Sequence, residues 1–131
     1  MVLARSVREV FDYILQEDRA LPVEKQTVFH LRRFTTELAF RTQDLGGDAR
    51  GKIGEIVLRA GIAGWSNFRD ASGSEIECKH DKGKHLVWGA TVEDPLTKDA
   101  MSWLPPEIVG ELGNAIIAGN TLTEEDAKNS S

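Results

Sequence analysis

The chain has 131 residues, of which 40% are hydrophobic, and its 16 Lys and Arg against 21 Asp and Glu give a formal net charge of -5. This composition supplies enough apolar side chains for one core and excludes a disordered chain. The acidic balance argues against a general nucleic-acid-binding protein, because such proteins carry a surplus of basic residues.

The sequence predicts a protein that stays in the cytoplasm where it is made. Cys78 is the only cysteine, so an internal disulfide is impossible and nothing indicates an oxidising compartment. Residues 1–9 have no apolar stretch of signal-peptide length, because Arg5, Arg8 and Glu9 interrupt it. No segment approaches the roughly 20 apolar residues that cross a membrane.

The first predicted elements are two strands. Residues 10–15 are rich in aromatic and branched side chains, and residues 27–32 alternate between two faces, as strands do. The charged residues 16–26 would join them as an exposed loop. A helix over 6–15 is the alternative, because the apolar residues of that segment also recur at helical spacing.

Two helices are predicted next. The first would begin at a capping Thr35 or Thr36 and run to Leu45, before a glycine pair. The second would begin at Asp48 and end at Gly61. Its apolar residues follow the spacing of one buried helix face: Ile53, Ile56, Val57 and Ala60.

A turn and a polar hairpin are predicted to follow. Residues 70–73 have turn chemistry, since an aspartate can bond its own backbone and a glycine can adopt a positive φ. Residues 75–80 and 85–92 would be the two strands of a hairpin around residues 82–83.

The last predicted helix begins at Pro105–Pro106, after a short turn that Thr97 or Asp99 opens. Its residues form one apolar stripe: Ile108, Val109, Leu112, Ala115 and Ile116. The segments together predict an α+β fold, with antiparallel hairpins packed against about three helices in a single domain over 1–121. Residues 122–131 would be an acidic, flexible C-terminal tail.

The motifs that suggest catalysis fail on inspection. Residues 46–52 have the glycine and lysine spacing of a phosphate-binding loop, but Ile53 stands where that loop needs a Ser or Thr hydroxyl. Ser66 lacks the second glycine of a nucleophile elbow. The sequence therefore predicts a protein that is not an enzyme and uses no cofactor.

A metal site is the alternative that the sequence leaves open. Cys78, His80 and His85, with Asp81 nearby, include soft and imidazole ligands for zinc, and a strand would place residues 78 and 80 on one face. Structural zinc sites usually take four ligands at paired spacings, and this chain has one cysteine. The sequence therefore predicts no bound metal, with a three-ligand catalytic site as the alternative.

The aromatic residues divide between the core and a candidate interface. Trp65 and Phe68 are predicted to be core anchors. Trp88 lies in a polar segment, so the sequence leaves two alternatives for it, an interface residue or a core residue. The candidate interface consists of Trp88 and its neighbour His85, with Glu124 and Glu125 of the acidic tail.

Four short segments of the chain are distinctive. In chain order they are TVFHLR (27–32), AGIAGWSNF (60–68) with Asp70 and Gly73, LPP (104–106), and NTLTEE (120–125) with Lys128 and Asn129. In this order they resemble segments of small tail-region proteins of tailed bacteriophages, especially the tail assembly chaperones. Such chaperones are acidic proteins that coat the tape-measure protein while the tail tube polymerises. The resemblance implies no cofactor and no catalytic residues.

The resemblance leads us to expect a bacteriophage tail or virion assembly protein that acts by protein–protein binding. Its partners would be other phage morphogenesis or virion proteins and further copies of itself, with no direct contact to nucleic acid or membrane. It would work in the host cytoplasm during assembly and could remain in the virion. One alternative is a permanent minor component of the connector, tail or baseplate. From another class, the alternative is a small metal-dependent enzyme or a host-directed effector.

Overall fold

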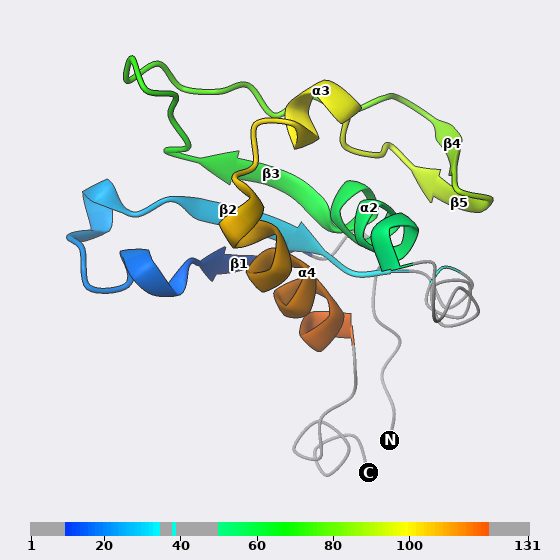
Figure 1. Ribbon diagram of the computed structural model, residues 1–131, viewed down its shortest axis with the longest axis horizontal. Helices are drawn as coiled ribbons and strands as arrows, with labels where there is room; N and C mark the ends of the chain where they lie inside the picture. Colours follow the sequence, from blue (N-terminus) through cyan, green and yellow to red (C-terminus); the bar gives the residue numbers. More distant parts are fainter. Residues whose placement is uncertain (1–9, 35–37, 39–49, 121–131) are drawn as a thin grey trace, which may run out of the picture.

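The structure is a computed structural model, and it describes residues 10–34, residue 38 and residues 50–120. The elements, in chain order, are β1 (Val10–Ile14), η1 (Gln16–Asp18), η2 (Val23–Lys25), β2 (Val28–Arg32), α2 (Arg50–Gly61), β3 (Ile62–Ser66), β4 (Lys84–Val87), β5 (Ala90–Glu93), α3 (Lys98–Met101) and α4 (Pro106–Asn120). Antiparallel hairpins pack with helices (Figure 1), so the predicted α+β class is confirmed.

The larger sheet has three antiparallel strands in the order β1-β2-β3. In the β1–β2 pair, Phe11 lies opposite Leu31 and Asp12 opposite His30. The two predicted strands are therefore confirmed, and the helical alternative for 6–15 is wrong over Val10–Ile14; residues 6–9 lie outside the described part of the chain. The loop between these strands is exposed, as predicted, and includes the two short 3-10 turns η1 and η2.

The third strand, β3, was not predicted. It begins directly after α2, and Phe29 of β2 lies opposite its Trp65. Ala63 and Gly64 within it have low strand propensity, so the local sequence does not indicate a strand. The strand forms because β2 supplies the hydrogen-bonding partner, which is a tertiary contact.

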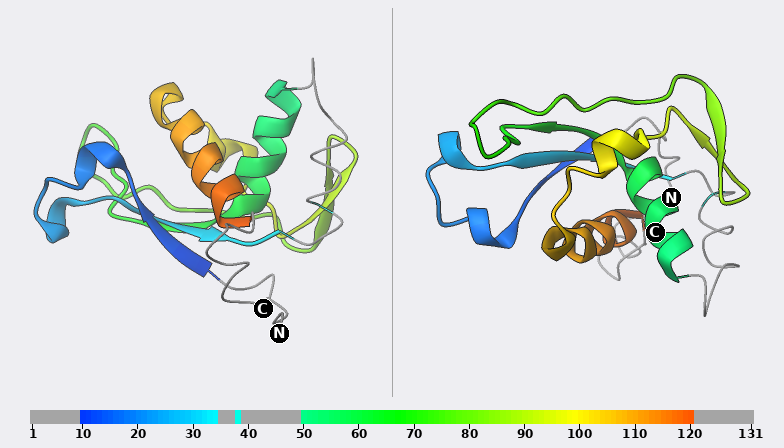
Figure 2. Two further views of the ribbon diagram at one scale, coloured as in Figure 1. Left: turned by 90° about the horizontal axis from the view of Figure 1, so that it is seen from below. Right: turned by 45° about the horizontal axis from the view of Figure 1, so that its top comes forward.

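The core lies between one face of this sheet and helices α2 and α4. Both helices stand on the same side of the strands, next to each other (Figures 1 and 2). A Cβ on Gly61 would lie 2.6 Å from the Ile116 side chain, so the glycine lets the end of α2 touch α4. The largest fully buried residues include Phe29, Leu31, Ile56, Ile62, Leu112 and Ile116. The opposite, outer face of the sheet includes Val28, His30 and Arg32, which are partly exposed.

The predicted helices are recovered where the structure describes them. Three residues of the predicted α2 stripe, Ile56, Val57 and Ala60, are buried, and Ile53 is half-buried. Leu58 and Arg59 are buried as well. Arg59 is tolerated there because its Nε donates to the Leu96 carbonyl over 2.8 Å and its guanidinium faces the carboxylates of Asp81 and Glu55. The predicted helix from Thr35 or Thr36 to Leu45 lies outside the described residues except for the buried, helical Leu38, and the Asp48 cap lies outside them entirely.

The C-terminal helices also follow the prediction. Thr97 caps α3, since its Oγ1 accepts a hydrogen bond from the Ala100 amide over 3.0 Å. In α4, the residues of the predicted stripe are buried or half-buried: Ile108, Val109, Leu112, Ala115 and Ile116. The predicted domain end at residue 121 and the tail 122–131 lie outside the described residues. Within the described ranges, no helix is both long and apolar enough to cross a bilayer.

The turn at 70–73 is confirmed, and Gly73 has a φ of 87°. The predicted hairpin that follows is wrong. Strand β4 pairs with β5, Lys84 opposite Glu93, around a turn at Trp88–Gly89 instead of 82–83. Segment 75–80 contributes single bridges, such as Arg69 to Glu75. The error has a physical cause: a tight turn at Trp88 needs a positive φ on a bulky residue, which sequence patterns disfavour.

Candidate functional site

The tip of the β4–β5 hairpin is an apolar projection. We define the hairpin tip as Leu86 and Trp88. Leu86 is 74% exposed and Trp88 is 50% exposed. Trp88 has a φ of 51° and Gly89 a φ of 81°. A two-residue hairpin turn with positive φ at both positions favours Asn-Gly or Asp-Gly, so a tryptophan at the first position is unusual.

The rest of the hairpin is anchored to the domain. Val87, Ala90 and Val92 are each 2% exposed and pack in one cluster with Ile56 of α2. Beside the tip, Nζ of Lys52 in α2 lies 4.9 Å from the centroid of the Trp88 ring, a cation–π contact. The hairpin tip is thus held on a packed base, with its indole oriented by a cation.

The predicted interface residues are brought together only in part. His85 is exposed on the same hairpin as Trp88, and its Nε2 lies 2.7 Å from the Lys82 carbonyl oxygen. Glu124 and Glu125 lie outside the described residues. Leu86, the most exposed apolar residue of the hairpin, was missed; its position next to Trp88 in a polar segment was the available signal.

The residues of the possible metal site do not converge. His80 Nε2 lies 2.9 Å from the Ile62 carbonyl oxygen, whereas His85 contacts the backbone of its own hairpin. Across the described ranges, no group of three His, Cys, Asp or Glu side chains is placed to hold a metal ion. Burial raises the pKa of the Cys78 thiol from 9.0 to about 12, against the opposing effect of the Arg32 cation.

We expect iodoacetamide to alkylate Cys78 at pH 8 about a hundredfold or more slowly in the native protein than in the unfolded chain, because only the thiolate reacts. The native rate should then rise with pH through pH 11, since the thiolate fraction keeps growing up to the raised pKa of about 12. The unfolded rate should level off above pH 9. Intact-mass kinetics in buffer and in guanidinium measure both rates, and equal rates at pH 8 would show that Cys78 is not protected.

A hydrogen-bonded row of three polar side chains crosses the outer face of the sheet. His30 Nδ1 lies 2.7 Å from Asp12 Oδ1, and His30 Nε2 lies 2.8 Å from Ser66 Oγ. We call these residues the Asp–His–Ser row. They come from β1, β2 and β3, one from each strand. The side chain of His30 is 33% exposed and that of Asp12 is 67% exposed.

The strand register explains how the row forms. Asp12 lies directly opposite His30, and on the other side of β2 Gly64 lies opposite His30. The imidazole lies beside Gly64 and reaches Ser66, two residues further along β3. A Cβ on Gly64 would lie 3.5 Å from the His30 ring, an ordinary van der Waals distance. From the sequence, Ser66 was weighed only as part of a nucleophile elbow, and its links to His30 and Asp12 were missed, because only the register places the three together.

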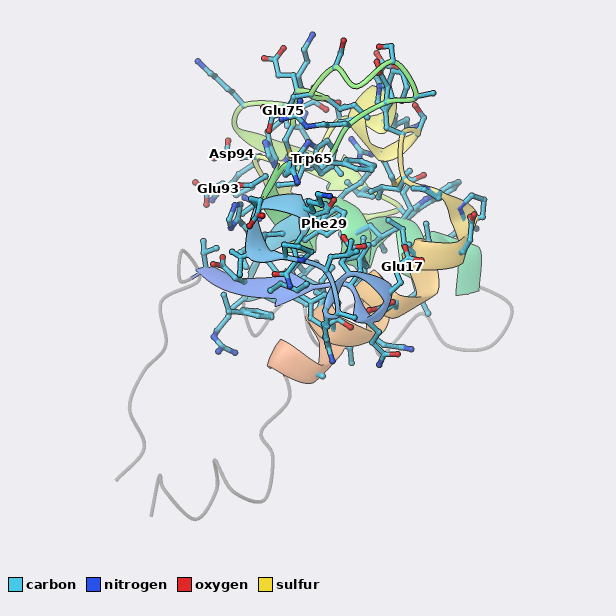
Figure 3. The ribbon with its side chains drawn as sticks, turned by 90° about the vertical axis from the view of Figure 1, so that its left-hand side faces the viewer. Glu17, Phe29, Trp65, Glu75, Glu93 and Asp94 are labelled. Carbon is cyan, nitrogen blue, oxygen red and sulfur yellow. The ribbon has the colours of Figure 1, made fainter. Side chains whose placement is uncertain are left out.

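A hollow of about 250 Å³ lies where β2, the end of α2 and β5 meet. Arg32 forms part of its wall and is held in place, with Nε donating to the Ala60 carbonyl and Nη2 to the Asp94 carbonyl, each over 2.6 Å. Burial lowers the pKa of Arg32. Glu93 and Asp94 lie on the side of the sheet away from α4 (Figure 3), and together with Arg32 and Arg33 they give the hollow a lining of both charges.

The described surface therefore has two distinctive features, the apolar hairpin tip and the Asp–His–Ser row, with a hollow lined by residues of both charges near the base of the hairpin. The tip suits a protein partner, and the row has the donor and acceptor arrangement of an activated hydroxyl. No protein-family model, no curated protein and no solved structure was found to match the chain.

Proposed function

We propose that this chain is a bacteriophage tail or virion assembly protein that acts by binding other virion proteins. The structural observation that supports the binding part is Trp88, a bulky side chain in the left-handed region, 50% exposed, at the tip of an anchored hairpin. The phage part rests on the resemblance of the segments at 27–32, 60–68, 104–106 and 120–125.

The backbone of Trp88 makes a role in folding a poor explanation for this residue. A left-handed conformation costs a residue with a side chain roughly 1–2 kcal/mol. Glycine would remove that cost, and asparagine would reduce it. Burial of the indole could offset it, but half of the residue stays exposed. An observed backbone outlier of this kind is a reason to infer function.

The hairpin is also suited to binding because its geometry is set before a partner arrives. The buried Val87, Ala90 and Val92 fix its base, and Lys52 orients the Trp88 ring. A rigid aromatic anchor loses little conformational freedom on binding, so more of its contact energy becomes affinity. Tryptophan is among the residues most enriched at the energetic centres of interfaces.

The charges near the hairpin indicate what the partner's surface should be like. The chain has a formal net charge of -5, and the exposed Glu93 ends β5 at the base of the hairpin. Lys84 lies opposite Glu93 and Lys52 lies beside the Trp88 ring, so the charges around the tip are mixed. A partner surface with an apolar centre for Trp88 and Leu86 and residues of both charges around it would complement this arrangement.

The proposal is tested by peptide mass spectrometry on density-purified particles of the phage that encodes the chain, with copy number per particle. A fixed copy number would support a permanent virion component, the second form of the proposal. Presence in infected-cell lysate with absence from particles, together with recovery in a complex with the tape-measure protein, would support the chaperone form. Absence from particles and from every complex of morphogenesis proteins would overturn both.

A further inference from the structure

The Asp–His–Ser row has no part in the proposed binding function. We propose that Ser66 is a nucleophile activated by His30 and Asp12, and that it accepts acyl groups from uncharged esters. The inference rests on the geometry of these three side chains, so it stands or falls separately from the role of the hairpin tip.

The two nitrogens of His30 have the partners that an acyl-transfer triad requires. A carboxylate accepts hydrogen bonds only, so the contact of Nδ1 with Asp12 Oδ1 at 2.7 Å places the proton of the neutral ring on Nδ1. The Nε2 lone pair then faces Ser66 Oγ at 2.8 Å and can accept the hydroxyl proton. Carboxylate on Nδ1 and serine on Nε2 are the roles that identify a triad on any fold.

The backbone after Ser66 supplies a hydrogen-bond donor for a developing oxyanion. In nucleophile elbows, one such donor is the N–H of the residue that follows the serine. Here that residue is Asn67, which has a φ of 59° and whose N–H donates to Glu75 Oε1 over 3.1 Å. Glu75 is exposed, so its carboxylate can leave and a substrate oxygen can take the position of the carboxylate oxygen.

The surroundings of Ser66 indicate the class of substrate. Val28 lies opposite Ser66 and Ile14 opposite Val28, so two half-buried apolar side chains share the outer face with the serine. The Asp12 carboxylate disfavours anionic acyl groups. An uncharged ester with a short aliphatic acyl chain fits this face.

The chemical step balances with water as the only co-reactant. Ser66 Oγ attacks the ester carbonyl carbon, its proton moves to His30 Nε2, and the oxyanion accepts from the Asn67 N–H. The C–O bond to the alcohol breaks, and the proton on Nε2 passes to the departing alkoxide. Nε2 then deprotonates a water whose oxygen attacks the acyl carbon, the bond from that carbon to Ser66 Oγ breaks, and the proton on Nε2 returns to Oγ as the carboxylic acid leaves. We expect the reaction to be slow, because the Asn67 N–H is the one oxyanion donor assigned and Asp12 is exposed. A missing oxyanion donor lowers the rate by a factor on the order of 10² to 10³.

Because turnover should be slow, the test uses covalent labelling of the full chain by a fluorophosphonate probe, read by intact mass and peptide mapping. We expect one adduct, on Ser66, that is absent in Ser66→Ala. Asp12→Asn should reduce the labelling rate about tenfold or more, because the wrong tautomer of His30 becomes favoured. Glu75→Ala should increase the rate, since it releases the Asn67 N–H; a purely structural hydrogen-bond chain would not respond in this way.

Ser72→Ala is the matched control, because the Ser72 hydroxyl donates to Asp70 Oδ1 over 2.6 Å and, among the described residues, lies within hydrogen-bonding distance of Ser74 Oγ and of no histidine. It should leave the adduct unchanged. Circular dichroism melts of every variant confirm folding. A folded wild-type protein that gains no adduct on Ser66, or one whose labelling rate is unchanged in a folded Asp12→Asn variant, would overturn the proposal.

Discussion

We expect Trp65→Ala to lower the free energy of unfolding by about 3–5 kcal/mol, the range for large aromatic residues truncated in a core. Trp65 is 8% exposed and lies next to Phe29 at the centre of the view in Figure 3. The two rings meet edge to face with centroids 6.1 Å apart, and Phe68 meets Trp65 in the same way at 5.0 Å. Truncation removes both contacts and leaves a cavity.

A hydrogen bond adds to the effect. The indole Nε1 of Trp65 donates to the Ile76 carbonyl over 2.7 Å. This bond fixes segment 75–80, which has no regular ladder of its own, to the end of β3. Its loss would leave a buried carbonyl without that donor, at a cost of about 1–3 kcal/mol. Trp65→Phe should therefore lower the free energy of unfolding by less than Trp65→Ala does. The loss should still exceed what the smaller side-chain volume alone predicts, because phenylalanine cannot donate to the Ile76 carbonyl.

Urea denaturation followed by circular dichroism measures these differences. Trp103→Ala is the matched control, because Trp103 is 53% exposed and its truncation should change the free energy of unfolding by less than about 0.5 kcal/mol. If Trp65→Ala unfolds at the same urea concentration as the parent, Trp65 is not a core anchor.

For Trp88→Asn we expect opposite effects on stability and on function. Asparagine adopts positive φ more readily than tryptophan, so the free energy of unfolding should stay equal or rise slightly. Under the proposed function, binding to the partner virion protein should weaken by about 2 kcal/mol or more, which is roughly thirtyfold in affinity, because the aromatic anchor of the hairpin tip is lost. Loss of the Lys52 cation–π contact is small by comparison, since Lys52 is exposed.

Complementation of a phage that lacks this gene measures the functional effect, and a urea melt measures the stability. Trp88→Asn should reduce the titre of viable phage at least tenfold, whereas Trp103→Ala, a change to an equally exposed tryptophan elsewhere, should not. A full titre with Trp88→Asn would remove the hairpin tip from the proposed interface. A reduced titre with an unfolded variant would contradict the expected stability.

Elements with local sequence signals could be predicted before the structure was known. Alternation predicts β2 and the apolar stripe predicts α4, because each signal lies within a few neighbouring residues. The sequence offers Thr97 or Asp99 as the start of the short turn that follows β5, and the structure selects Thr97. The burial of Trp65 also followed from its size and type, since a domain of this length needs large side chains to fill its core.

Strand β3, the hairpin turn and the Asp–His–Ser row depend on tertiary contacts and could not be predicted from local patterns. Strand β3 exists because β2 pairs with it, and the turn is at Trp88 because the packed base of the hairpin outweighs an unfavourable φ. Asp12 and Ser66 are 18 and 36 positions from His30, so no local pattern links them. Strand register brings them together, and register depends on contacts between distant segments, which local propensities do not encode.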